Sequence, residues 1–116
     1  MAYLQGFVAA APAGKKDAYL ATAVKFAEIM KSHGATEVVD AWGDDVPEGK
    51  LTSFPWAVKA EPGEVVTFGY VIWPSKAARD AGQQKAFEDP RMQSMDMPFD
   101  GKRMIMGGFE IISQVL

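Results

Sequence analysis

The only histidine of the chain, His33, is the first residue to test for catalysis. A Ser-His-Asp triad would have to use it, yet no G-x-S-x-G elbow or similar nucleophile context accompanies it. It follows a helical pattern that ends at Ser32, where an imidazole commonly caps carbonyl groups and interacts with the helix dipole. We therefore favour a capping role, with a base or ligand contact at a pocket mouth as the functional alternative.

A second candidate is Arg103, which closes the turn Asp100-Gly101-Lys102-Arg103. Its neighbour Lys102 makes a cationic pair that could stabilise a carboxylate or an enolate. The alternative is a turn that orders the last strand and pairs with local carboxylates, and we favour that alternative.

Two groups of side chains could bind a metal ion. Asp44, Asp45 and Glu48 supply three carboxylates, but they lack the spacing of a calcium-binding EF-hand loop. Five methionines could bind Cu(I), although no cysteine or nearby histidine supports them, and flexible packing explains them better. These methionines are Met92, Met95, Met97, Met104 and Met106. We expect no metal and no cofactor.

Large aromatic side chains on neighbouring predicted strands could line a cavity between helices and sheet. They could equally form packed core, which is the reading we favour. These aromatics are Trp42, Trp56, Phe68, Tyr70 and Trp73. The candidate pocket consists of Trp42, Phe68, Tyr70, Trp73, His33 and Arg103.

The elements that would position these residues follow from hydrophobic periodicity and from turn signals. Helical spacing and a Ser75 N-cap predict the two helices, and short apolar or β-branched runs predict the strands. Pro55 assigns its strand to a sheet edge, because proline cannot donate to a ladder. The expected order is strand 3–11, helix 15–32, strand 35–42, inserted edge strand 51–60, strand 65–73, helix 75–88 and strand 103–112.

This order predicts an α+β fold, the ferredoxin-like split βαβ arrangement with an inserted edge strand. Both helices should cover one face of an antiparallel sheet. Strand 65–73 (VVTFGYVIW) is nevertheless apolar on both faces, so the second face needs a cover as well. We expect a homodimer packed sheet to sheet, in which each partner buries roughly 800 Å². The alternative is a monomer whose long loops cover that face.

Length and composition limit the function classes. The 116 residues, of which 48% are hydrophobic, suit a single domain spanning 1–116. A net charge of -3 without a basic run gives no electrostatic basis for nucleic-acid binding. The longest mostly apolar segment, 65–73, is half the length of a membrane span, and no basic region marks a signal peptide. With no cysteine in the chain, we expect a soluble cytoplasmic protein without a membrane partner.

Several segments together resemble the YbaA-like family of small bacterial proteins of unknown function. They include DDVPEGK (44–50), TSFP (52–55), PSKAARDA (74–81), MPFDGKRM (97–104) and GGFE (107–110). The resemblance implies a dimeric α/β barrel, a fold shared with the antibiotic-biosynthesis monooxygenases, and it implies no agreed reaction.

Three functional hypotheses remain open at the level of sequence. The first is binding of a small apolar or aromatic molecule in a cavity of a dimeric α/β barrel. The second is a cofactor-free monooxygenase-like enzyme, with Trp42 and Tyr70 binding substrate and His33 or Arg103 handling a proton or an anion. The third is a non-catalytic structural or partner-binding dimer.

Overall fold

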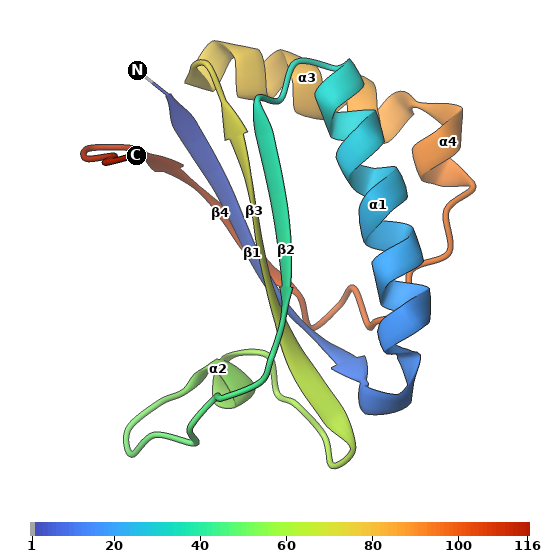
Figure 1. Cartoon of the computed structure of the whole chain (residues 1–116), viewed down its shortest axis with the longest axis vertical. Helices are drawn as coiled ribbons and strands as arrows, with labels where there is room; N and C mark the ends of the chain where they lie inside the picture. The colour runs from blue at the N-terminus through green and yellow to red at the C-terminus, as the bar shows by residue number, and fades with distance from the viewer. Residues whose placement is uncertain (1) are drawn as a thin grey trace.

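A four-stranded antiparallel sheet forms the centre of the computed structural model, which describes residues 2–116 (Figure 1). Its strands lie in the order β2-β3-β1-β4, the ferredoxin-like arrangement predicted from the sequence. The two longest and most apolar strands occupy the centre, and the shorter strands occupy the edges. The strands are β1 (Tyr3–Pro12), β2 (Glu37–Trp42), β3 (Glu64–Trp73) and β4 (Ile105–Glu110).

The two long helices pack on the same face of the sheet (Figure 1). Helix α1 (Lys16–Ser32) follows β1 through the short turn η1 (Ala13–Lys15), and α3 (Lys76–Glu88) leads into the single turn α4 (Pro90–Gln93). The Ser75 hydroxyl accepts a hydrogen bond from the Ala78 amide, which confirms the predicted N-cap of α3. We call the sheet side that carries these helices the helix side, and the opposite side the far face.

The predicted inserted edge strand 51–60 is wrong. This segment contains a helical turn, α2 (Phe54–Ala57), in a loop between β2 and β3. The Ser53 hydroxyl accepts a hydrogen bond from the Trp56 amide at 3.1 Å, and Pro55 lies in the first turn, where a missing amide hydrogen costs nothing. Ser53 and Pro55, two residues apart, therefore indicate the start of a helix and not an edge strand.

The core on the helix side is closed by a tight contact between α3 and β3. Trp73 and Met30 are completely or almost completely buried there, together with Val71 and Ala86. A Cβ at Gly82 would overlap the Trp73 ring, so this glycine lets α3 lie directly on the indole.

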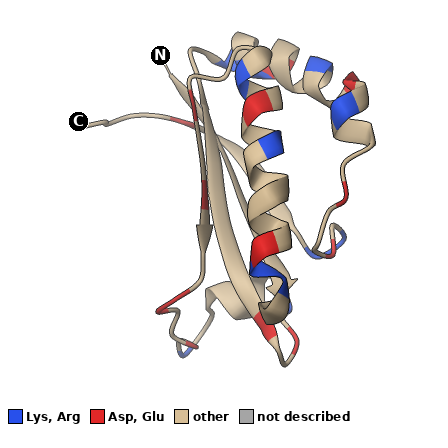
Figure 2. Ribbon diagram, turned by 45° about the vertical axis from the view of Figure 1, so that its right-hand side comes forward, with Lys and Arg blue, Asp and Glu red and all other residues tan. Residues whose placement is uncertain are grey.

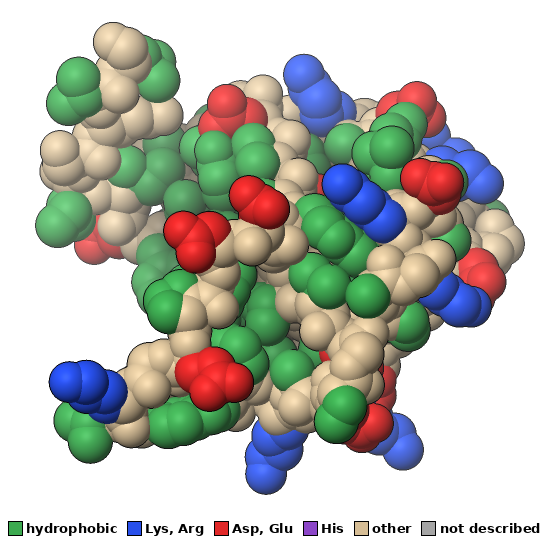
Figure 3. Space-filling model, turned by 60° about the horizontal axis from the view of Figure 1, so that its bottom comes forward, with side chains coloured by type: hydrophobic (Ala, Val, Ile, Leu, Met, Phe, Trp, Pro, Cys, Tyr) green, Lys and Arg blue, Asp and Glu red, His purple; other side chains and the backbone are tan. Residues whose placement is uncertain are grey.

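The far face is covered at one end only. Near the bottom of Figure 1 the segment after α2 lies over the sheet, where Val58 packs against Val8 and Val66. Phe68, which packs edge-on against Phe54 of α2, and Ile105 lie at the border of this cover and are each 44% exposed. Phe109, toward the other end, is 59% exposed. Figure 3, which looks at the bottom of the molecule, shows hydrophobic side chains in the recess between two projections on its left-hand side.

Charged residues lie mainly on helices and loops, and the strands are almost free of them (Figure 2). Within residues 2–116, no helix has both the length and the apolar character needed to cross a bilayer. The sheet is therefore the apolar layer of the molecule, and its few charged positions are informative.

Candidate functional site

A cavity of about 120 Å³ lies on the helix side, enclosed by α1, the sheet, the α3–α4 region and the segment 94–104. We call it the helix-side cavity. Among its thirteen lining residues, only Tyr19, Thr22 and Asp40 have polar side chains. The apolar lining residues are Phe7, Ala23, Phe26, Met30, Phe87, Met92, Met97, Phe99, Met104 and Met106.

Asp40 reaches this cavity because of its position on β2. Val38, Asp40 and Trp42 pair with Val71, Gly69 and Thr67 respectively, and all six point to the helix side. A Cβ at Gly69 would overlap the Phe7 ring and lie 2.9 Å from an Asp40 carboxylate oxygen. The glycine thus provides the space in which a carboxylate and a phenyl ring share the sheet surface.

The carboxylate has one weak hydrogen bond. The hydroxyl of Tyr19, on α1, lies 3.5 Å from Asp40 Oδ1 and only 3.0 Å from Thr67 Oγ1, to which it donates. Thr67 in turn donates to the Ala9 carbonyl at 3.4 Å. Because the tyrosine proton is better placed toward Thr67, Asp40 is left with little hydrogen-bond support.

Burial changes the acidity of both groups. Desolvation raises the pKa of Asp40 to about 6, and the hydrogen bond from Tyr19 opposes this shift only in part. Desolvation also raises the pKa of Tyr19, and the nearby Asp40 charge adds to that effect. At neutral pH the cavity therefore contains a carboxylate that is ionised but more basic than an ordinary aspartate, beside a neutral phenol.

The six residues of the predicted pocket are not brought together by the structure. Trp73 is buried in the core beneath α3, and Trp42 packs edge-on against Tyr19 with ring centroids 5.5 Å apart. Phe68 and Tyr70 point to the far face, because they pair with Val8 and Gly6. None of these four aromatic residues is among the lining residues of the helix-side cavity.

Local partners accept hydrogen bonds from four of the five N–H donors of the Arg103 guanidinium. It donates two hydrogen bonds to the Glu64 carboxylate, at 2.7 and 2.8 Å, one to the Asp100 carboxylate and one to the Lys59 carbonyl. Hydrogen bonds from Arg103 lower the pKa of Glu64 to about 2. This arrangement matches the local pairing that we favoured for the turn.

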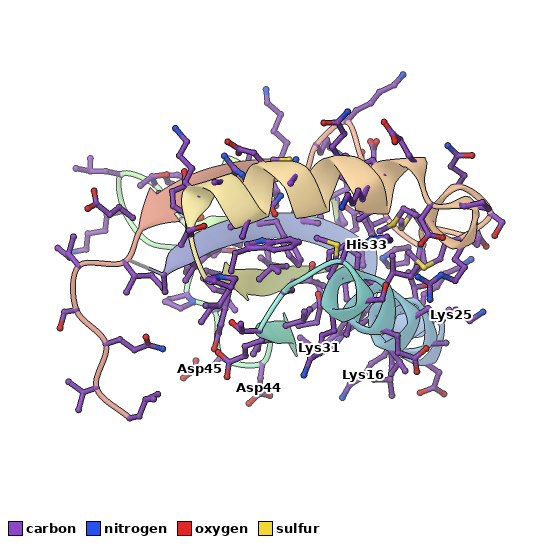
Figure 4. The ribbon with its side chains drawn as sticks, turned by 90° about the horizontal axis from the view of Figure 1, so that it is seen from above. Lys16, Lys25, Lys31, His33, Asp44 and Asp45 are labelled. Carbon is purple, nitrogen blue, oxygen red and sulfur yellow. The ribbon has the colours of Figure 1, made fainter. Side chains whose placement is uncertain are left out.

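His33 is the C-cap residue of α1, and its Nε2 lies 2.8 Å from Asp89 Oδ2. Arg91 also pairs with this carboxylate, and hydrogen bonds from Arg91 and His33 lower the pKa of Asp89 well below its usual range. Figure 4 shows His33 at the end of α1, with the labelled lysines on the outer side of that helix and Asp44 and Asp45 on the loop after β2. Asp44 and Asp45 are exposed, and no metal-binding group of His, Asp or Glu occurs within residues 2–116.

Sequence reasoning missed Asp40 and Tyr19 as site residues. A signal was present, since Asp40 alternates with Val38 and Trp42 on one face of the strand and has apolar neighbours on both sides in the sequence. The methionines were noticed but were interpreted as packing, whereas four of the five line the cavity and Met95 packs beside the core.

Comparisons with known proteins agree with this fold. The chain is 54% identical to the uncharacterized protein YbaA of Escherichia coli K12 over 114 residues, which cover 97% of each chain, and equally similar to YbaA of Shigella flexneri. A dimeric ferredoxin-like protein from an uncultured marine organism superimposes with a TM-score of 0.62 at 10% identity, over 99% of this chain and 100% of that one. Rv0793 from Mycobacterium tuberculosis superimposes with a TM-score of 0.54 at 11% identity, over the full length of both chains.

The family profile described as "Protein of unknown function (DUF1428)" matches residues 2–101, which is most of the chain. This match and the identity to YbaA bear out the resemblance drawn from the sequence motifs. The chain therefore belongs to the DUF1428 family of proteins of unknown function, together with YbaA.

Proposed function

We propose that the protein binds a small aromatic or apolar molecule in the helix-side cavity. The observation that carries this proposal is an apolar enclosure containing one ionisable carboxylate, Asp40. Largely apolar pockets with a few placed polar groups are the usual form of small-molecule sites.

The size of the cavity limits the ligand. An apolar cavity of roughly 150 Å³ is known to hold benzene, so about 120 Å³ suits a single ring. Methionine side chains are flexible, and five of them line the cavity. Met30 is on α1 and Met92 on α4, and the other three, Met97, Met104 and Met106, follow α4 in the sequence. A larger ligand would therefore require the segment 94–104 to move outward.

Titration calorimetry with toluene tests the binding proposal. We expect toluene to bind the wild-type protein and to raise its melting temperature, since a ligand of the folded state stabilises it. Ala23→Leu should abolish binding by filling the cavity, whereas Ala21→Leu, at an exposed position of the same helix, should leave it unchanged. Failure of a panel of one-ring compounds to bind, or equal binding by Ala23→Leu, would contradict the proposal.

A cofactor-free oxygenase-like enzyme is the second candidate. It is favoured by Asp40, because a carboxylate with a pKa near 6 in an apolar site can act as a general base on an acidic substrate. The cavity volume argues against a tricyclic substrate in this arrangement of the 94–104 segment. Oxygen uptake with one-ring quinols should depend on Asp40, and a flat trace with the wild-type protein would remove this candidate.

We further propose that the protein is a homodimer whose subunits contact each other through the far face. The support is the exposed apolar patch that includes Phe68, Ile105 and Phe109, on a fold shared with a protein described as dimeric. A dimer without catalytic activity would have the same interface, so this proposal holds for each of the functional candidates.

Sedimentation of matched variants tests the dimer. The wild-type protein should sediment at about twice the 12.6 kDa chain mass, and Phe68→Lys should shift it to the monomer. Leu20→Lys, which places the same charge on an exposed apolar position of α1, should remain dimeric. A folded wild-type monomer at micromolar concentration would overturn this interface.

A further inference from the structure

The hydrogen bonding of Asp40 is incomplete, and this incompleteness indicates what the cavity recognises. Within residues 2–116, Tyr19 is the one side chain recorded as a donor to this carboxylate, at 3.5 Å. The same hydroxyl lies 3.0 Å from Thr67, and its single proton cannot serve both acceptors well. The other lone pairs of this half-buried carboxylate face the cavity, where a donor on a ligand can reach them.

We propose that the ligand is a one-ring compound carrying a neutral hydroxyl group, as in a phenol, and that this hydroxyl donates a hydrogen bond to Asp40. The proposal rests on the binding function proposed above and adds the recognised group to it. The ring would lie among the phenylalanine and methionine side chains, which offer only apolar contacts.

The apolar lining favours a hydroxyl over an ammonium group. Ten of the thirteen lining residues are apolar, and Asp40 is the only one of the thirteen with a charged side chain. Moving an ammonium ion from water into such a cavity costs far more hydration than moving a neutral hydroxyl, which a single hydrogen bond to the carboxylate satisfies.

The hydrogen-bond chain around Tyr19 supports the same assignment. The Tyr19 hydroxyl lies 3.0 Å from Thr67 and 3.5 Å from Asp40, and Thr67 donates to the Ala9 carbonyl, so this chain brings at most one proton to the carboxylate. The chain also fixes the Tyr19 ring at one wall of the cavity, close to Trp42 and Phe99. The carboxylate is thus the acceptor of the site, and a hydroxyl on the ligand supplies a further proton.

The test compares phenol with toluene, which have nearly the same shape and differ in the hydroxyl. At pH 7.5 phenol should bind the wild-type protein roughly ten- to hundredfold more tightly than toluene, the usual net effect of a hydrogen bond to a charged group. In Asp40→Leu, phenol should lose this advantage while toluene still binds. Asp44→Leu makes the same substitution at an exposed aspartate outside the cavity and should leave the preference for phenol unchanged.

A pH series on the wild-type protein gives the same answer without any substitution. Asp40 and Tyr19 are the only titratable side chains among the lining residues, and Tyr19 stays neutral below its raised pKa. Protonation of Asp40 near pH 5 should therefore weaken phenol binding and leave toluene binding unchanged. This arm remains decisive if Asp40→Leu does not fold.

The other possible outcomes distinguish the hydroxyl assignment from the binding function on which it rests. Equal affinity for phenol and toluene would overturn the hydroxyl assignment and leave the cavity as an apolar binding site. Tighter binding of benzylamine than of phenol would overturn the choice of a neutral hydroxyl. Absence of binding by both phenol and toluene would overturn the binding function itself.

Discussion

The two faces of the sheet are covered differently, although the strands carry apolar side chains on both. On the helix side, α1 and α3 bury the core and leave a small cavity that contains Asp40. On the far face, the α2 segment covers one end, and apolar side chains beside and beyond this cover stay partly exposed. An apolar strand thus shows that a surface must be covered, but the connections between strands decide whether the chain itself supplies the cover.

The two faces also differ in the kind of site that we expect on each. The helix side carries Asp40, whose pKa is raised to about 6 by burial, and the exposed side chains of the far face are mainly apolar. A ligand site is therefore expected on one face and a subunit contact on the other. Substitutions on opposite faces of the same strand can test this division.

The largest effect should come from the pair Trp73→Ala and Phe68→Ala, both on β3. Trp73→Ala removes a completely buried indole and should lower the free energy of unfolding by about 3–5 kcal/mol at every protein concentration. Phe68→Ala removes a partly exposed ring that packs against Phe54, so it should cost about 1–2 kcal/mol in the monomer and more only at concentrations where the dimer forms. Urea denaturation at several protein concentrations measures both, and equal losses for the two variants at all concentrations would contradict the contrast.

A smaller effect is expected for Gly69→Ala, which tests the space beside Asp40. The new methyl group would overlap the Phe7 ring, and overpacking of this kind should lower the free energy of unfolding by about 1–3 kcal/mol. Gly14→Ala serves as the control, because nothing lies within 4 Å of a Cβ at that position, and it should change stability by less than about 0.5 kcal/mol. Thermal denaturation of both variants gives the comparison, and a neutral Gly69→Ala would show that the ring and carboxylate can move apart.

The smallest effect concerns the pH dependence caused by Asp40. Its pKa is about 6 in the folded protein and about 3.9 in an unfolded chain, so the folded state binds more protons between these values. Stability contributed by this residue therefore falls as the pH rises from about 4 to 6 and stays low above that range. After allowance for partial exposure, Asp40→Asn should raise the free energy of unfolding at pH 7 by about 1 kcal/mol.

Denaturant melts at pH 4.5 and pH 7 measure this change. The variant should be nearly neutral at the lower pH and stabilised at the higher one. Stabilisation of equal size at both values would mean that the carboxylate is not desolvated in the folded protein.

Much of the fold was readable from local patterns. The spacing of Tyr19, Phe26 and Met30 predicts α1, and Ser75 marks the start of α3. Such signals act over a few residues, so they need no knowledge of the tertiary contacts. The segment 51–60 failed because Pro55 has two local meanings, an edge strand or a first helical turn, and the Ser53 cap selects the second.

The candidate site was much less accessible to sequence reasoning. Trp42 and Trp73 pack against other side chains, and their residue types alone did not reveal that neither of them lines the cavity. Asp40 gains its basicity from burial, and burial depends on Tyr19 and on methionines more than fifty residues away along the chain.

The sequence by itself determined the four strands and the two long helices, but not the α2 turn, and it indicated the family to which the chain belongs. Periodicity and capping are local properties of the backbone, and they survive without tertiary information. Only the tertiary structure decided that Asp40 shares a cavity with Tyr19, that Arg103 pairs with Glu64 and Asp100, and that the far face is half covered. These three features depend on contacts between residues that are far apart in the sequence, and such contacts form only when the whole chain packs.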